Sequence, residues 1–154
     1  LVDTMTTDKN VYPKSKGLTA GTYYAQEITA PAGYVRSDKI HTLTVKASKT
    51  TGISLTDVEQ LGSITIYKEG EVLVGWNGSN FTYETRKLPG ATFKVTAGAD
   101  IYKADGTKVY NEGDVIAENL VSGSDGQAVL SDLHLGTYVV TETKSIDGLV
   151  IFLN

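Results

Sequence analysis

The sequence predicts an all-β protein, best described as a β-sandwich, and three observations support this prediction. Apolar and polar residues alternate in short runs such as SITIYK, ATFKVTA, TYVVTE and HTLTV, with the period of a half-buried strand. No segment keeps an apolar period of 3.6 residues, so no amphipathic helix is expected. Asp-Gly turn signals at 105–106, 125–126 and 147–148 separate the runs, and 16 glycines with only three prolines suit strands joined by tight turns.

The expected strands end at turn signals, and four of them carry an ionisable residue in an unusual place. Side chains alternate between the two faces of a strand, so Tyr23, Ala25 and Glu27 of GTYYAQE share one face. Three later rows have the same form: Ile53, Leu55 and Asp57; Ile64, Ile66 and Lys68; and Tyr138, Val140 and Glu142. An unpaired charge in a protein interior is costly. Either these rows face outward, or the ionisable residue at the end of each has a function.

A long internal repeat divides the chain. GTYYAQEITAPAGY at residues 21–34 recurs without a gap as GTYVVTETKSIDGL at residues 136–149, which pairs Glu27 with Glu142, 115 residues apart. A repeat of this length predicts two copies of one domain. Residues 1–61 correspond to the later part of a first domain, and residues 62–154 to a second domain without its last strand. We therefore expect both domains to be truncated by the chain ends, as in a window cut from a tandem array.

Composition excludes several classes of function. The net charge of −4 and the lack of a basic cluster argue against an electrostatic nucleic-acid binder. The absence of cysteine excludes thiol catalysis, disulfides and cysteine-based metal sites. His41 and His134 occupy non-equivalent positions in the two copies, so no metal pair or catalytic triad is expected. No signal peptide, membrane span or sorting tail is present, so any export or anchoring signal is expected outside this window.

These motifs resemble a known family. GSITIYKEG, LPGATFKV, DGQAVLSDLHLGTYVVTET and the APAGY of the first copy are similar to the Cna B-type and SpaA-type domains of Gram-positive pilins and surface adhesins. The resemblance covers nearly the whole chain from Leu18 onward. It implies tandem Ig-like sandwiches of the prealbumin-like type. It also implies a spontaneous amide (isopeptide) cross-link between a Lys on the first strand and an Asn or Asp on the last, assisted by a buried Glu.

The resemblance assigns a role to each ionisable residue. In the second domain Lys68 is the amine donor and Glu142 the assisting acid, with the acceptor expected beyond the chain end rather than at Asn154. In the first domain Glu27 is the assisting acid and Asp57 the acceptor, with its partner Lys outside the chain. The chemistry needs burial, because an ammonium has no lone pair for attack and an apolar interior disfavours charge on both Lys and Glu. A protonated Glu can then donate to the acceptor carbonyl.

Simpler interpretations stand beside these roles. Glu27 and Glu142 could be surface residues of edge strands, Lys68 a solvated lysine, and Asp57 an ordinary strand-ending residue. The VYPK sequence that contains Lys14 resembles a pilin motif, but it precedes the GTYYAQE strand, so an incidental turn is the favoured interpretation. Residues 71–87 exceed the needs of a hairpin loop and carry the only tryptophan, Trp76. They form either an extra hairpin or a ligand site.

The expected function is structural, with no enzymatic activity and no cofactor. The domains would form the stalk of a cell wall-anchored, extracellular pilin or adhesin, with neighbouring domains or subunits of the same assembly as partners. One alternative is a binding module that contacts a host protein or glycan through residues 71–87. Another is an accessory domain of a secreted carbohydrate-active enzyme.

Overall fold

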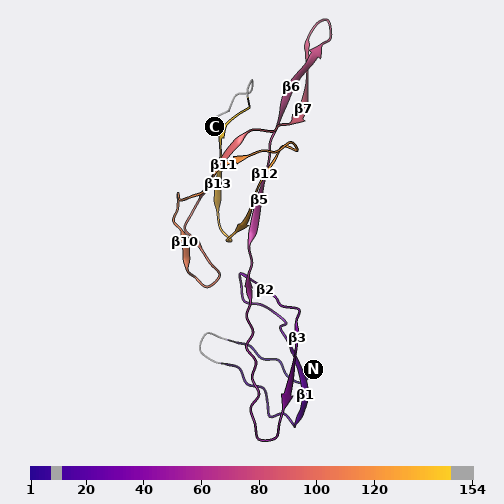
Figure 1. Ribbon diagram of the computed structural model, residues 1–154, viewed down its shortest axis with the longest axis vertical. Coiled ribbons are helices and arrows are strands. Elements are labelled where there is room, and N and C mark those ends of the chain that lie inside the picture. Colours follow the sequence, from indigo (N-terminus) through magenta and orange to yellow (C-terminus); the bar gives the residue numbers. More distant parts are fainter. Residues whose placement is uncertain (8–11, 147–154) are drawn as a thin grey trace. The chain divides into compact units, whose positions relative to one another are not determined.

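The computed structural model describes residues 1–7 and 12–146, and this part of the chain consists of strands, turns and loops (Figure 1). The all-β prediction is confirmed. No helix in the described residues is long and apolar enough to cross a membrane. The chain separates into two compact units, Leu1–Val58 and Glu59–Asn154, which are described in turn.

Unit 1, Leu1–Val58, is built around one antiparallel strand pair. β1 (Gly21–Gln26) pairs with β3 (Ile40–Val45), so that Tyr23 lies opposite Leu43 and Ala25 opposite His41. These four side chains are half-buried, whereas Tyr24 on the other face is exposed, as the alternation predicts. The unit also contains the two-residue strand β2 (Tyr34–Val35), and β4 (Val58–Glu59) follows at the boundary of the units.

Unit 2, Glu59–Asn154, has two sheets that pack as layers. One sheet has the order β11-β8-β13 and the other consists of β12 and β5. β9 and β10 form a short antiparallel ribbon, and β6 and β7 form a long antiparallel hairpin. The strands are β5 (Gly62–Tyr67), β6 (Glu69–Trp76), β7 (Phe81–Lys87), β8 (Thr92–Ala97), β9 (Ile101–Tyr102), β10 (Lys108–Tyr110), β11 (Val115–Val121), β12 (Gln127–Leu133) and β13 (Tyr138–Lys144).

The core of unit 2 lies between these sheets. Phe93 of β8 and Ala128 of β12 are buried against each other, together with Ala91. Ile66 of β5 and Leu120 of β11 pack on this cluster from the two layers. Strict alternation along β8 explains the arrangement, because every second residue of that strand is buried.

One expected strand does not form. Residues 53–57 alternate as a strand should, yet no ladder is assigned to them, and Ile53 and Leu55 are exposed at 41% and 49%. A strand requires a neighbour to satisfy its backbone groups, and the described residues supply none for this segment. The alternation predicted the faces of the side chains but not the presence of a partner. The expected strand at residues 53–57 is therefore wrong for this structure.

Candidate cross-linking sites

The backbone of Lys68 is fixed immediately after β5. Its N–H donates to the carbonyl oxygen of Gly126 at 2.8 Å, and its own carbonyl accepts from the N–H of Leu88 at 2.9 Å. Ile64 and Ile66, two and four residues earlier, are half-buried on the same face of β5. The lysine therefore enters the sandwich at the end of an apolar row, and both of its backbone groups are paired.

Glu142 approaches from the other sheet. It lies on β13 opposite Phe93 of β8, with Val140 opposite Val95 and Tyr138 opposite Ala97. Directly opposed residues share a face, and the three β8 residues are buried. Glu142 therefore stands on the interior face of its sheet, above the phenylalanine of the core.

The two side chains meet. Lys68 Nζ lies 2.9 Å from Glu142 Oε2, and only 21% of the lysine side chain and 19% of the glutamate side chain are exposed. The other carboxylate oxygen, Glu142 Oε1, is buried and has no hydrogen-bond partner among the described residues. A buried oxygen of this kind normally has a partner, so its position suits an additional polar group.

The arrangement brings together two of the three groups that amide formation requires. Lys68 supplies an amine, and Glu142 supplies a carboxyl that can exchange a proton with it at hydrogen-bond distance. Within the described residues, neither side chain is hydrogen-bonded to an Asn or Asp. The expected acceptor near the end of the domain, and the alternative Asn154, lie outside the described residues.

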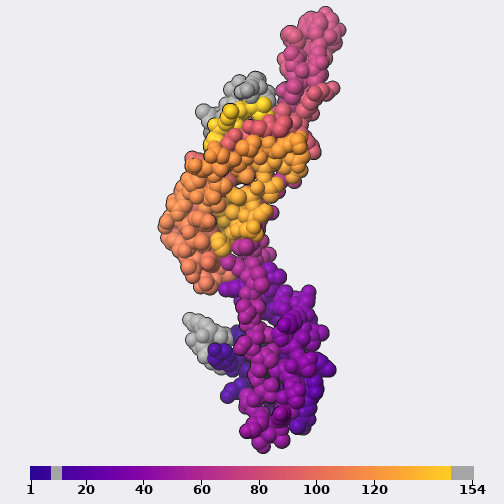
Figure 2. Space-filling view, in the orientation of Figure 1, coloured from indigo at the N-terminus to yellow at the C-terminus, as the bar shows by residue number. Residues whose placement is uncertain are grey.

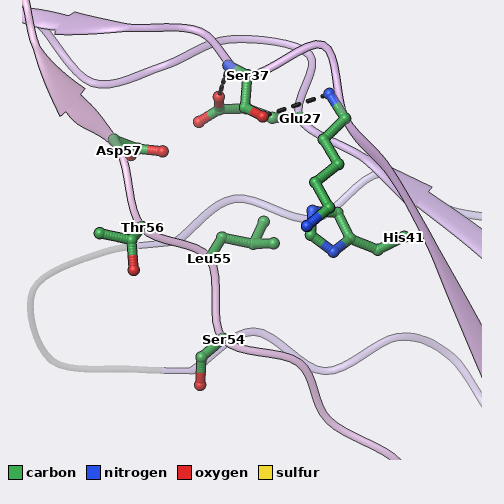
Figure 3. A pocket seen from close by; sticks show the side chains of 8 residues that line it. Glu27, Ser37, His41, Ser54, Leu55, Thr56 and Asp57 are labelled. Carbon is green, nitrogen blue, oxygen red and sulfur yellow. Dashed lines mark hydrogen bonds between the residues drawn. The ribbon is translucent and has the colours of Figure 1, made fainter.

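Unit 1 also contains two of the three groups that amide formation requires, and both are carboxyl groups. Glu27 and Asp57 both line an open cavity of about 260 Å³, whose wall also includes Leu55, His41 and Ser37. Figure 3 shows the two carboxylates directed toward the same part of the cavity, with His41 on its other side. Glu27 Oε2 accepts a hydrogen bond from the backbone N–H of Ser37 at 2.7 Å. The cavity therefore brings together an acid and an acyl group, and Leu55 is the one apolar residue among those that line it.

Sequence reasoning missed part of this cavity. Lys39 contributes to its wall, and its backbone N–H donates to Ser37 Oγ at 3.3 Å. The exposed position of Lys39 distinguishes it from the half-buried Lys68. Its place in the cavity depends on the turn that joins β2 to β3, which carries no alternating pattern in the sequence. The donor lysine of this unit is expected outside the chain.

A comparison with models of protein families shows to which family the chain belongs. The family model described as SpaA, prealbumin-like fold domain, matches residues 1–59 and 81–152, which together make up most of the chain. The chain belongs to the SpaA family. The comparisons found no matching curated protein and no matching solved structure.

SpaA domains are typically structural rather than enzymatic, and they are typical of surface-exposed proteins of Gram-positive bacteria. The family match omits residues 60–80, which include β5, Lys68 and β6. The resemblance at Lys68 therefore depends on the spacing of GSITIYKEG and on the contact with Glu142, not on the matched segments.

Residues 71–87 belong to the hairpin of β6 and β7. Figure 2 shows it standing away from the rest of unit 2. At its tip the rings of Trp76 and Phe81 are in edge-to-face contact, with centroids 5.0 Å apart and planes inclined by 61°. Trp76 is 57% exposed and Phe81 60% exposed. Trp76 thus packs within its own hairpin rather than in the sandwich core.

His134 of unit 2 has a structural contact that sequence reasoning missed. His134 Nδ1 lies 3.0 Å from Glu59 Oε1, which also accepts a hydrogen bond from the N–H of Ala104. The hydroxyl of Tyr138 donates to the carbonyl of His134 at 2.7 Å, and burial, together with the nearby Tyr110, raises the pKa of this tyrosine. No group of metal-binding side chains occurs in the described residues.

Proposed function

We propose that this chain is part of the stalk of a Gram-positive pilin or adhesin, stabilised by amide cross-links between Lys and Asn or Asp. The main support is the pair of Lys68 and Glu142, one-fifth exposed, with Nζ and Oε2 2.9 Å apart. The buried Glu142 Oε1, without a partner among the described residues, suits a hydrogen bond to an incoming acceptor carbonyl. The domains would be extracellular and cell wall-anchored.

The reaction is a single turnover within the protein. In the proposed first step a proton passes from Lys68 Nζ to Glu142 Oε2, 2.9 Å away, which leaves a neutral amine and a protonated acid. The amine attacks the acyl carbon of an Asn or Asp, and the acid protonates the developing oxyanion. One N–C bond forms, and ammonia leaves from Asn or water from Asp. Because the strands hold the groups in contact, the effective molarity is high and no enzyme is needed.

Unit 1 would use the same chemistry, but here the sequence contains the acid and the acceptor and not the amine donor. Glu27 is the proposed assisting acid and Asp57 the proposed acceptor, since both line one cavity. The amine would come from a lysine outside this sequence. Each cross-link would join the first and last strands of its unit. Neighbouring domains or subunits of the same surface protein are the proposed partners.

A covalent bond between terminal strands has a mechanical consequence. Pulling on a sandwich from its two ends separates the edge strands first, and an amide between those strands prevents separation without breaking a covalent bond. The chain has no cysteine, so disulfides cannot provide this protection. Amide cross-links would therefore suit a shaft that holds a binding tip away from the cell wall.

The test is the intact mass of a polypeptide extended by about one strand, roughly five to six residues, in each direction. Each cross-link at an Asp should lower the mass by one water, and each cross-link at an Asn by one ammonia. Lys68→Arg and Glu142→Ala should each abolish the loss of mass that comes from the cross-link in unit 2. Neither variant should change the loss of mass that comes from unit 1. A full, unmodified mass in a folded protein would contradict the cross-link proposal.

A second function is supported by the hairpin. Opposed residues share a face, so the pairs Trp76–Phe81 and Leu73–Tyr83 place four large apolar side chains on one side of β6 and β7. All four are exposed. We propose that this face contacts a host protein or glycan, since exposed apolar patches with aromatic residues are typical of interaction sites. Trp76→Ala should weaken pull-down of the partner, whereas Tyr24→Ala, an exposed tyrosine of unit 1, should not.

A further inference from the structure

We propose that Asn77 is a site of spontaneous deamidation, at which the side-chain amide becomes a carboxylate through a cyclic imide formed with the backbone nitrogen of Gly78. Asn77 directly follows Trp76 at the end of β6, in the turn that joins β6 to β7 (Figure 1). This inference is independent of the proposed cross-linking function, because neither Lys68 nor Glu142 takes part in it. Three features of the structure support it.

The first feature is the nucleophile, the backbone nitrogen of Gly78. This nitrogen must lose its proton before it attacks, and a hydrogen bond from the N–H to an acceptor would disfavour that loss. The Gly78 N–H has no acceptor among the described residues. Residues 77–80 are exposed, so water reaches the N–H. No atom lies within 4 Å of a Cβ built on Gly78, so neither a neighbour nor a side chain of its own hinders the attack.

The second feature is the side-chain amide of Asn77. Its Oδ1 accepts hydrogen bonds from the backbone N–H of Ser79 at 3.0 Å and from that of Asn80 at 2.8 Å. Donors at a carbonyl oxygen stabilise the negative charge that develops there when the carbon is attacked. The leaving group, Asn77 Nδ2, donates to no acceptor within the described part of the chain. The turn therefore polarises the carbon that Gly78 attacks and leaves the departing nitrogen unbound.

The third feature is that comparable turns elsewhere in the chain hold the corresponding proton. The glycine N–H groups of two Asp-Gly turns, those of Gly106 and Gly126, both donate to backbone carbonyls at 2.9 Å. Asn111 is followed by Glu112, whose N–H donates to Asp100 Oδ1 at 3.0 Å. In these turns a hydrogen bond occupies the proton that the attack must remove. The structure therefore distinguishes the turn between β6 and β7 from them.

The reaction needs only water as a co-reactant. Base in the solvent removes the proton of the Gly78 N–H, the nitrogen attacks Asn77 Cγ, and an N–C bond forms. The Cγ–Nδ2 bond breaks, and Nδ2 leaves as ammonia with a proton from water. The cyclic imide then adds water at one of its two carbonyl carbons and opens to aspartate or isoaspartate. The net change is the loss of one ammonia and the gain of one water.

The product changes the charge of the hairpin tip. The new carboxylate stands next to Trp76 and Phe81, two exposed aromatic residues. In the aspartate product it can accept the same N–H groups of Ser79 and Asn80, and hydrogen bonds to a charged acceptor are stronger than those to an amide. The uncharged tip therefore becomes anionic while the turn keeps its side-chain hydrogen bonds.

The experiment incubates the folded 154-residue chain in mildly alkaline buffer and follows one tryptic peptide, residues 69–86. This peptide should lose one ammonia and gain one water with time, and an isoaspartyl methyltransferase should label part of it. Asn77→Asp should abolish the change in mass. Asn80→Asp, the matched control, keeps the backbone N–H at that position and should leave the change in mass intact. Gly78→Ala should slow it severalfold, because the added Cβ hinders the attack.

A second Asn-Gly sequence tests the role of the free N–H. Glu112→Gly places a glycine after Asn111, where the N–H donates to Asp100 Oδ1. In this variant, shown by circular dichroism to be folded, Asn111 should release ammonia severalfold more slowly than Asn77. In urea-denatured chain the two sites should react at similar rates. Equal rates in the folded variant, or an Asn77 amide that survives in the folded chain and is lost in the denatured one, would overturn the proposal.

The peptide that changes in mass separates this reaction from a cross-link. An amide cross-link to an Asn also releases one ammonia, as does the cyclic imide before water opens it. Residues 69–86 include neither Lys68 nor Glu142. A change confined to this peptide therefore supports deamidation whether or not a cross-link forms, and an unchanged peptide overturns deamidation without affecting the proposed function.

Discussion

Gly126 lies so close to Lys68 that a side chain at the glycine would collide with the lysine backbone. A Cβ on Gly126 would stand 2.7 Å from the carbonyl oxygen of Lys68 and 3.0 Å from Cβ of Lys87. The Gly126 carbonyl meanwhile accepts the N–H of Lys68. Gly126 also has φ of +73°, a region that disfavours other residues. The turn before β12 therefore positions the proposed donor lysine.

Gly126→Ala should destabilise unit 2 by roughly 2–4 kcal/mol, the sum of a left-handed backbone conformation and a steric overlap. It should also displace the Lys68 backbone and slow formation of any cross-link. Urea unfolding followed by circular dichroism measures the first effect, and the time course of intact mass the second.

Gly106→Ala is the matched control for that experiment. Gly106 also has positive φ, at +86°, but no atom lies within 4 Å of a Cβ built on it. This variant should cost only about 1 kcal/mol for the backbone conformation. Equal losses of stability in the two alanine variants would show that the contact with Lys68 is unimportant.

Lys68 and Glu142 should be energetically coupled. Lys68→Met or Glu142→Leu leaves the other charge partly buried without its partner, and each should cost about 1–3 kcal/mol of unfolding free energy. The double variant should be more stable than the two single losses added together predict, by roughly 1–2 kcal/mol, because no unpaired charge remains. A double-mutant cycle on protein shown by mass to be uncross-linked measures this coupling.

The exposed pair of Arg86 and Glu84 provides the reference for the cycle. Their side chains are 57% and 60% exposed and lie 3.1 Å apart, so solvent screens the interaction. Their coupling should be less than about 0.5 kcal/mol. Strictly additive effects at Lys68 and Glu142 would show that the half-buried pair behaves as a surface pair, which would weaken the cross-linking proposal.

Ser122 should be important for stability although it has no role in the proposed reaction. Its buried hydroxyl donates to the carbonyl of Leu88 at 2.8 Å and accepts the N–H of Ala91 at 3.0 Å. Ser122→Ala leaves both backbone groups without that partner and should cost about 2 kcal/mol. Ser124→Ala, an exposed serine two residues later, should change the unfolding midpoint little. Similar midpoints for the two variants would contradict this interpretation of Ser122.

Alternation along single strands was sufficient to predict much of this structure. It identified β5, β8 and β13, because one buried face requires a period of two, although Val140 in the expected inward row of β13 is 40% exposed. The position of Lys68 at the end of β5 and that of Glu142 on β13 follow from the same rule. The all-β class and the SpaA family are confirmed.

Contacts between distant segments could not be predicted in this way. Glu59 and His134 are 75 residues apart, and nothing in the local pattern of either indicates the other. The close approach of Gly126 to Lys68 depends on the register of β12 against β5. Residues 53–57 have the pattern of a strand but pair with no strand in the part of the chain that the structure describes. In each case the decisive information is the arrangement of two segments, which a local period does not contain.

Asp100 should give unit 2 a pH-dependent stability in acid. Hydrogen bonds from Lys108 and from the N–H of Glu112 hold the pKa of Asp100 below its usual value of 3.8. The unfolded chain therefore binds this proton at higher pH than the folded chain. The stabilisation is present above pH 3.8 and is lost as pH falls through the lower pKa of the folded state.

Asp100→Asn should therefore flatten the decline in stability below pH 4, when unfolding midpoints in urea are measured between pH 6 and pH 2 at constant ionic strength. Glu118→Gln is the control, because Glu118 is an exposed carboxylate of β11 without a hydrogen bond or ion pair in the described residues. The unfolding midpoint of this variant should decline below pH 4 as that of the unsubstituted chain does. Lys108 supplies the largest part of the effect, so Lys108→Met should flatten the same decline while Asp100 is retained. An unchanged decline in both the Asp100 and the Lys108 variants would show that this cluster is solvated and contributes nothing to acid stability.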